Sequence, residues 1–105
     1  MSEIITENKI KSTIQNILHD AGLASEDQAL KNQARMIALS RVNKYESEIS
    51  NFQNKYEIVF AEFEKQLKKQ KNEESFECED DYLDWKFAVE ALKVWKERIK
   101  ILNHA

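Results

Sequence analysis

The feature that most restricts the folds open to this chain is its lack of turn-forming residues. Its 105 residues include no proline and a single glycine, Gly22. A sheet protein of this length ordinarily needs several such residues in its turns. Hydrophobic residues make up 42% of the chain and charged residues 33%, and the two kinds are interleaved, which favours amphipathic helices over disorder. The sequence therefore predicts an all-α protein, and its length predicts a single domain over residues 1–105.

Hydrophobic periodicity predicts a first and a last helix. The first covers residues 1–22, where Gly22 is placed to end the helix in a left-handed conformation. The last covers residues 79–103 and carries two apolar stripes, an arc wide enough to be wedged between neighbours. One stripe consists of Trp85, Ala88, Val89, Leu92, Trp95, Ile99 and Leu102, and the other of Leu83, Phe87, Ala91, Val94 and Ile101.

A long second helix is predicted over residues 25–71, starting at a capping box formed by Ser25 and Gln28. Its apolar residues follow a heptad seam, which we interpret as a folding or self-association surface. The seam residues are Tyr45, Ile49, Phe52, Tyr56, Val59 and Phe63. Read as one helix, the segment is roughly 70 Å long and needs a partner along its length. A break near residues 56–60 is the alternative, because Ile58 and Val59 have modest helix propensity.

Together these helices predict a helical hairpin or small bundle of the second and last helices, with the first helix packed on it or exchanged between chains. A homodimer is expected, because two-sided apolar faces on long helices leave hydrophobic surface uncovered in so short a chain. A connection is expected around residues 71–76, where lysines are followed by acidic residues, as suits the dipoles of two successive helices.

Negative charge is concentrated at one place in the chain. Residues 73–84 contain seven carboxylates and no basic side chain, which argues against direct binding of nucleic-acid phosphates there. Acidic groups beside aromatic rings are typical of a docking patch for a basic protein, since charge steers the encounter and the rings anchor it. The predicted partner-binding residues are Glu77, Asp80, Asp81, Tyr82, Asp84 and Trp85.

The same acidic run has two other interpretations. The acids can simply complement the positive N-terminal dipole of the last helix. They can also supply ligands for a divalent cation, as in a metal-dependent helical hydrolase, but such sites need a matching set of carboxylates from a facing helix. For Trp85, a place in the core or in a dimer interface is the simpler interpretation.

No catalytic, cofactor-binding or metal-binding residues are predicted, and we do not expect an enzyme. The lone cysteine, Cys78, is interpreted as a bystander, and His19 and His104 lie far apart without a nucleophile at useful spacing. The sequence shows no apolar run of about 20 residues and no signal-peptide pattern, so a cytoplasmic protein without membrane contact is expected.

From about Leu30 to Leu102 the sequence resembles a family of small, largely uncharacterised prokaryotic helical proteins that are often encoded beside small toxin-like proteins. The likeness rests on residues 38–46, 52–56 and 60–64, and above all on residues 76–92, FECEDDYLDWKFAVEAL. The resemblance implies an antitoxin-like role with a small basic partner. It names no reaction and no catalytic residues.

One departure from the family pattern concerns the middle of the chain. In the family, the Lys-Tyr pair that corresponds to Lys55 and Tyr56 is usually followed by Gly, an apolar residue, and Ser or Thr, which is typical of a helix end followed by an N-cap. Here Glu57, Ile58 and Val59 stand in those places. The resemblance therefore favours a helix break that the residues themselves signal poorly.

The function expected from these observations is that of a protein-interaction module, antitoxin-like or regulatory, which docks through the acidic, aromatic start of the last helix. The alternatives are the metal-dependent hydrolase and a structural coiled-coil adaptor that binds through the seam.

Overall fold

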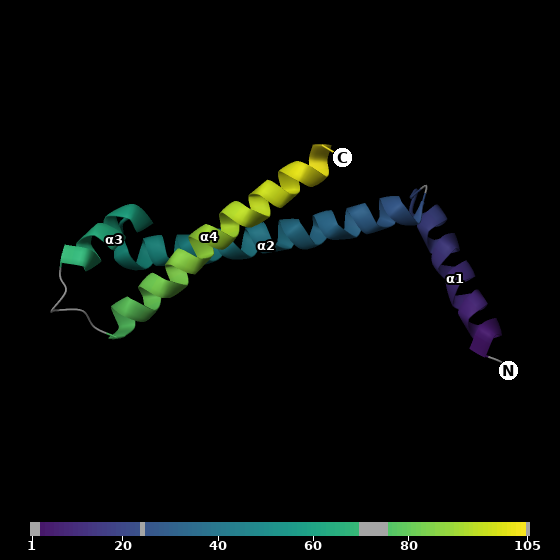
Figure 1. Cartoon of the computed structure of the whole chain (residues 1–105), viewed down its shortest axis with the longest axis horizontal. Helices are drawn as coiled ribbons and strands as arrows, with labels where there is room; N and C mark the ends of the chain where they lie inside the picture. The colour runs from purple at the N-terminus through teal and green to yellow at the C-terminus, as the bar shows by residue number, and fades with distance from the viewer. Residues whose placement is uncertain (1–2, 24, 70–75, 105) are drawn as a thin grey trace. The chain divides into compact units, whose positions relative to one another are not determined.

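The computed structural model describes residues 3–23, 25–69 and 76–104, and all the regular structure in these ranges is helical (Figure 1). Its elements are α1 (Glu3–Asp20), α2 (Glu26–Tyr56), α3 (Phe60–Lys69) and α4 (Phe76–His104). The all-α class predicted from the sequence is confirmed. Helix α4 begins three residues earlier than the predicted last helix, and most of the predicted connection at residues 71–76 lies outside the described residues.

The chain divides into two compact units, Met1–Met36 and Ile37–Ala105, where the sequence predicted a single domain. The division falls inside α2, so the first third of this helix belongs to the first unit and the rest to the second.

In the first unit, the turn between α1 and α2 is formed by local capping. Gly22 has a φ of 81°, and its N–H donates to the His19 carbonyl at 3.0 Å, while the Leu23 N–H donates to the Leu18 carbonyl at 2.9 Å. This pair of bonds is a Schellman motif, as the position of Gly22 predicted. The Ser25 hydroxyl then accepts from the Gln28 N–H at 3.1 Å, which caps the start of α2.

In the second unit, residues 25–71 do not form one continuous helix, and the break near residues 56–60 is the alternative that the structure has. Helix α2 ends at Tyr56, and Glu57 takes a left-handed φ of 56° that glycine ordinarily occupies. The Val59 carbonyl accepts from the N–H groups of Glu62 and Phe63, each at 3.1 Å, and so begins α3.

Helices α2 and α4 of the second unit run antiparallel, since Tyr45 meets Phe87, Phe52 meets Trp85, and Lys55 meets Asp81. Figure 1 shows α4 crossing α2, with α3 beside the start of α4. This arrangement is the helical hairpin that the sequence predicted, with α3 added to it.

The core of the second unit is an aromatic cluster centred on Trp85, whose side chain is fully buried. Its ring centroid lies 5.5 Å from Phe52, 5.4 Å from Phe60 and 5.1 Å from Phe63. These neighbours come from α2 and α3, so one tryptophan joins three helices. Aromatic pairs at such distances add about 0.5–1.5 kcal/mol each beyond their burial.

The predicted heptad seam is used largely within the chain. Tyr45 and Phe63 are buried, and Ile49, Phe52 and Tyr56 are half-buried, whereas Val59 is exposed at the break. The seam thus serves folding, one of the two roles the sequence indicated. Among the helices that the structure describes, none is long and apolar enough to cross a membrane.

Candidate functional site

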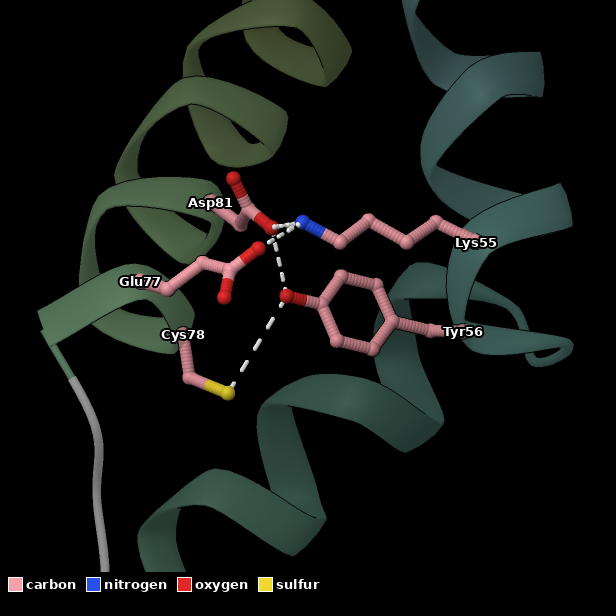
Figure 2. A network of polar contacts seen from close by, with 5 residues as sticks. All are labelled: Lys55, Tyr56, Glu77, Cys78 and Asp81. Carbon is pink, nitrogen blue, oxygen red and sulfur yellow. Dashed lines mark hydrogen bonds and ion pairs between the residues drawn. The ribbon is translucent and has the colours of Figure 1, made fainter.

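The start of α4 carries the acidic residues predicted to bind a partner, and two of them face α2 instead. Lys55 Nζ lies 2.6 Å from Glu77 Oε1 and 2.6 Å from Asp81 Oδ2. The Tyr56 hydroxyl donates to the same Oδ2 at 2.5 Å and lies 4.0 Å from Cys78 Sγ. Figure 2 shows both carboxylates turned from α4 toward the Lys55 ammonium group. This network joins the end of α2 to the start of α4.

The network shifts the pKa values of its members in consistent directions. Hydrogen bonds to Asp81 and then Glu77 raise the pKa of Lys55. Burial, followed by the hydrogen bond to Asp81, raises the pKa of Tyr56. Burial acts to raise the pKa of Asp81, but the hydrogen bonds from Lys55 and Tyr56 outweigh it and hold that pKa below its ordinary value of 3.8. The charged carboxylate is therefore stabilised in the fold.

The two aromatic residues of the predicted docking patch also face inward. The Tyr82 hydroxyl donates to Glu64 Oε2 on α3 at 2.7 Å, and its ring stacks on Phe60 at 5.8 Å. Trp85 is fully buried, so it cannot anchor a partner in this fold. It lies in the core, which was the other interpretation of this residue. The prediction that Trp85 contacts a partner is corrected by its burial.

The opposite side of α4 is an apolar stripe that faces solvent. Phe76, Leu83, Phe87, Val94 and Ile101 fall within about 40° of one another around the helix, because their spacings of seven and four residues are close to whole turns. Their exposed fractions are 87%, 61%, 62%, 49% and 60%, respectively. We call these five residues the outer face of α4.

Acidic side chains border the first half of the outer face. Glu79, Asp80 and Asp84 are exposed and lie within one turn of Leu83. From Phe76 to Trp85 the helix contains five carboxylates and no basic side chain, a formal charge of −5. This end of α4 therefore combines apolar side chains with an acidic rim, although only Asp80 and Asp84 of the six predicted partner-binding residues belong to that rim.

A shallow pocket of about 330 Å³ opens beside this acidic rim, between α2 and α4 of the second unit. Tyr45 and Phe87 provide aromatic surface to the pocket, and their rings meet edge-on with centroids 5.9 Å apart. Glu48 and Asp84 provide carboxylates, and Lys44 provides one ammonium group. Aromatic faces with adjacent carboxylates are suited to receiving the side chain of an arginine or lysine.

Among the described residues, helix α2 does not offer the start of α4 the facing carboxylates that a two-helix metal site requires. Opposite Glu77 and Asp81, helix α2 presents Lys55 and Tyr56. Within the described ranges, no three or more His, Cys, Asp or Glu side chains gather closely enough to hold a metal ion.

Two features of this site are missed by the sequence prediction. Lys55 is the internal counter-ion of the acidic run, and no signal near residue 77 points to a lysine 22 positions earlier. The exposure of Leu83 and Phe87 was missed because a broad apolar arc was expected to lie between neighbours. The sequence does indicate that Asp81 faces inward. This residue precedes Trp85 and Ala88 by four and seven positions, which puts it on the buried side of the helix.

Compared with protein-family models, with curated proteins and with solved structures, the chain has no match.

Proposed function

We propose that this protein is a protein-interaction module, antitoxin-like, that binds a basic protein partner through the acidic first half of the outer face of α4. The observation that carries the proposal is the combination of exposed Phe76, Leu83 and Phe87 on one helical face with Glu79, Asp80 and Asp84 beside it. Anchoring apolar side chains at helical spacing are the means by which an amphipathic helix binds a groove.

Charge defines the kind of partner. Acids at the rim of an apolar contact accelerate encounter with a basic surface and disfavour acidic partners. The network at Lys55 supports this role indirectly, because it satisfies Glu77 and Asp81 internally and anchors the helix from which the other acids project. A helix held rigidly loses less conformational entropy on binding than a mobile one.

The pocket between Tyr45 and Phe87 supplies a specific contact within the proposed interface. A partner arginine can lay its guanidinium group against the exposed ring of Phe87 and pair with Asp84 or Glu48. Such a contact is directional, whereas the acidic rim alone attracts any basic surface. The pocket therefore contributes specificity, and the rim contributes speed of association.

The antitoxin-like role rests on the resemblance of residues 76–92 to a family often encoded beside small toxin-like proteins. The coiled-coil adaptor is less well supported, because the seam residues Tyr45, Phe52, Tyr56 and Phe63 already contact aromatic rings within the chain. The partner that we propose is a small basic protein encoded by the neighbouring gene.

Binding to that gene product by isothermal titration calorimetry tests the proposal. Phe87→Asp and Leu83→Asp are expected to weaken the complex by about 100-fold or more, because each puts a charge into an apolar contact. Asp80→Lys with Asp84→Lys is expected to weaken it by about 10- to 100-fold and to reduce its dependence on salt.

Glu97→Lys is the matched charge control, since Glu97 is an exposed acid on the same helix, 13 residues beyond Asp84. It is expected to leave the affinity within about twofold of the original, as a distant rim charge contributes little. No complex with the unmodified chain, or equal affinity for the Phe87→Asp variant, overturns the proposal.

A further inference from the structure

The first unit carries a second unpartnered surface, which lies between α1 and the start of α2. A groove of about 830 Å³ is lined there mainly by aliphatic side chains. They are Ile10, Ile14, Leu18, Ala21, Leu23, Ala29, Leu30 and Met36. Of these, Ile10, Ile14, Leu30 and Met36 are 48–69% exposed.

The helices of this unit do not cover each other's apolar faces. Among its side chains that the structure describes, at residues 6–23 and 25–36, none is buried. Chains shorter than about 40 residues rarely form a sufficient core alone and usually need a crosslink, a metal ion or association with another chain. The well-formed caps at Gly22 and Ser25 set the turn, but a turn without burial does not stabilise a helix pair.

We infer that the first unit associates with the same unit of a second copy of this chain. When two identical helix pairs pack groove to groove around a two-fold axis, each copy supplies the aliphatic side chains that the other lacks. This surface is separate from the outer face of α4, so the inference goes beyond the proposed function and does not depend on it.

Charge favours a second copy over an unlike, strongly charged partner. Residues 1–36 contain four basic and five acidic side chains, a formal net charge of −1, so two copies repel each other little. The first ten residues of α4, by contrast, carry a formal charge of −5, and two copies of that surface repel. The two surfaces therefore select different partners.

The charges at the groove also complement themselves under two-fold symmetry. Glu7 and Lys11 both line the groove and stand four residues apart on α1. When two α1 helices cross antiparallel at Lys9, midway between Glu7 and Lys11, Glu7 of each copy comes opposite Lys11 of the other, and symmetry makes this pair twice. Two symmetry-related copies of one ion pair are the simplest self-complementary arrangement.

Sedimentation equilibrium of the full chain tests this inference. The mass expected at micromolar concentration is twice the 12.4 kDa of one chain. Ile14→Asp is expected to weaken self-association by about 100-fold or more, because it places two uncompensated carboxylates in the interface between the two copies. Ile101→Asp is the matched control, an exposed isoleucine outside the first unit, and it is expected to leave the dimer intact. Both tryptophans lie in the second unit, so their fluorescence reports its folding independently.

A charge exchange distinguishes this packing from general loss of structure. Glu7→Lys and Lys11→Glu are each expected to weaken the dimer by about tenfold, and the double variant is expected to restore it. A wild-type monomer at every concentration overturns the inference, and binding of a hydrophobic dye to that monomer would assign the groove to another occupant. An Ile14→Asp variant that dimerises normally also overturns it, and a double variant without rescue overturns the antiparallel crossing.

Discussion

Asp81 is the residue at which the polar contacts between the end of α2 and the start of α4 converge, since its Oδ2 accepts from both Lys55 and Tyr56. Its side chain is only 17% exposed and that of Lys55 is 44% exposed, so solvent screens this pair less than an ion pair with both partners fully exposed. Glu77, by contrast, is 71% exposed and contributes less. The two carboxylates that pair with Lys55 therefore differ in burial, and the more buried one, Asp81, is expected to contribute more to stability.

The network predicts how stability depends on pH. The lowered pKa of Asp81 means that its contribution is present above its ordinary pKa of 3.8 and is lost as the pH falls through the folded value. The pKa values of Lys55 and Tyr56 are raised, so the contributions of these two residues to stability are present below about pH 10 and are lost as the pH rises further. Stability is therefore expected to be level between about pH 5 and 9.

Urea unfolding followed by tryptophan fluorescence checks the acid side of this profile. The Asp81→Asn variant is expected to be less stable at pH 7 and to lose less stability between about pH 5 and 2 than the original chain, because the ionised carboxylate is gone. An unchanged acid slope in that variant would show that other carboxylates cause the loss.

Removing the Tyr56 hydroxyl isolates one bond of the network. Tyr56→Phe is expected to destabilise the second unit by about 1.5–3 kcal/mol, since the hydroxyl donates to a charged acceptor. Tyr82→Phe provides a comparison, because the Tyr82 hydroxyl donates to Glu64, which is more exposed than Asp81. A smaller loss is expected there, and chemical denaturation measures both. Equal losses of stability in the two variants would contradict the claim that the bond to Asp81 stabilises the fold more than the bond to Glu64.

At Trp85, packing and hydrogen bonding act in opposite directions. Its Nε1 is buried and has no hydrogen-bond partner among the described residues. Trp85→Ala is expected to cost about 3–5 kcal/mol through the cavity it leaves among Phe52, Phe60 and Phe63. Trp85→Phe is expected to cost about 2 kcal/mol less than that, because it keeps a ring and removes the unsatisfied donor. Thermal unfolding monitored by circular dichroism compares the two variants, and equal costs would contradict this interpretation.

At the scale of elements, the break between α2 and α3 is the feature that local residues support least. Glu57 holds a left-handed φ without being glycine, and Val59 occupies the N-cap position without a side chain that accepts a hydrogen bond. The break forms because tertiary packing brings Phe60 and Phe63 against Trp85. Packing of an amphipathic segment ordinarily outweighs such local preferences.

Replacing these residues with better-suited ones is expected to stabilise the second unit. Glu57→Gly removes a left-handed strain of about 1 kcal/mol. Val59→Ser adds a cap of about 0.5–2 kcal/mol and loses little burial, because Val59 is 55% exposed. Denaturant midpoints should rise for each variant and further for the pair. A lower midpoint for Glu57→Gly would show that the Glu57 side chain has a stabilising contact of its own.

The sequence predicted the helices well where local signals agree with packing. Gly22 and Ser25 marked the turn between α1 and α2. The absence of proline and of any glycine besides Gly22 predicted the all-α class. It could not decide the break at Glu57, because three-dimensional packing imposes it. The candidate site was predicted only in part, since Asp80 and Asp84 face solvent whereas Asp81 and Trp85 face inward. Adjacent residues on a helix diverge by about 100°, so one acidic run necessarily divides between faces.

For the whole molecule, two exposed apolar surfaces differ in charge and therefore in the partner that suits them. The groove of the first unit is close to neutral and is proposed to meet a second copy. The outer face of α4 begins among five carboxylates and is proposed to meet a basic protein. In a dimer formed through the first unit, each copy carries its own acidic docking face, and two linked sites raise avidity for a partner that is itself multivalent.

Amide hydrogen exchange of the chain, alone and mixed with the neighbouring gene product, tests the central claim most directly. If the partner binds the outer face of α4, protection is expected to increase over residues 76–87, with little change over residues 26–36 of α2. Protection confined to the seam at residues 45–63, or to residues 3–36, with no change over residues 76–87, would contradict the proposed docking surface.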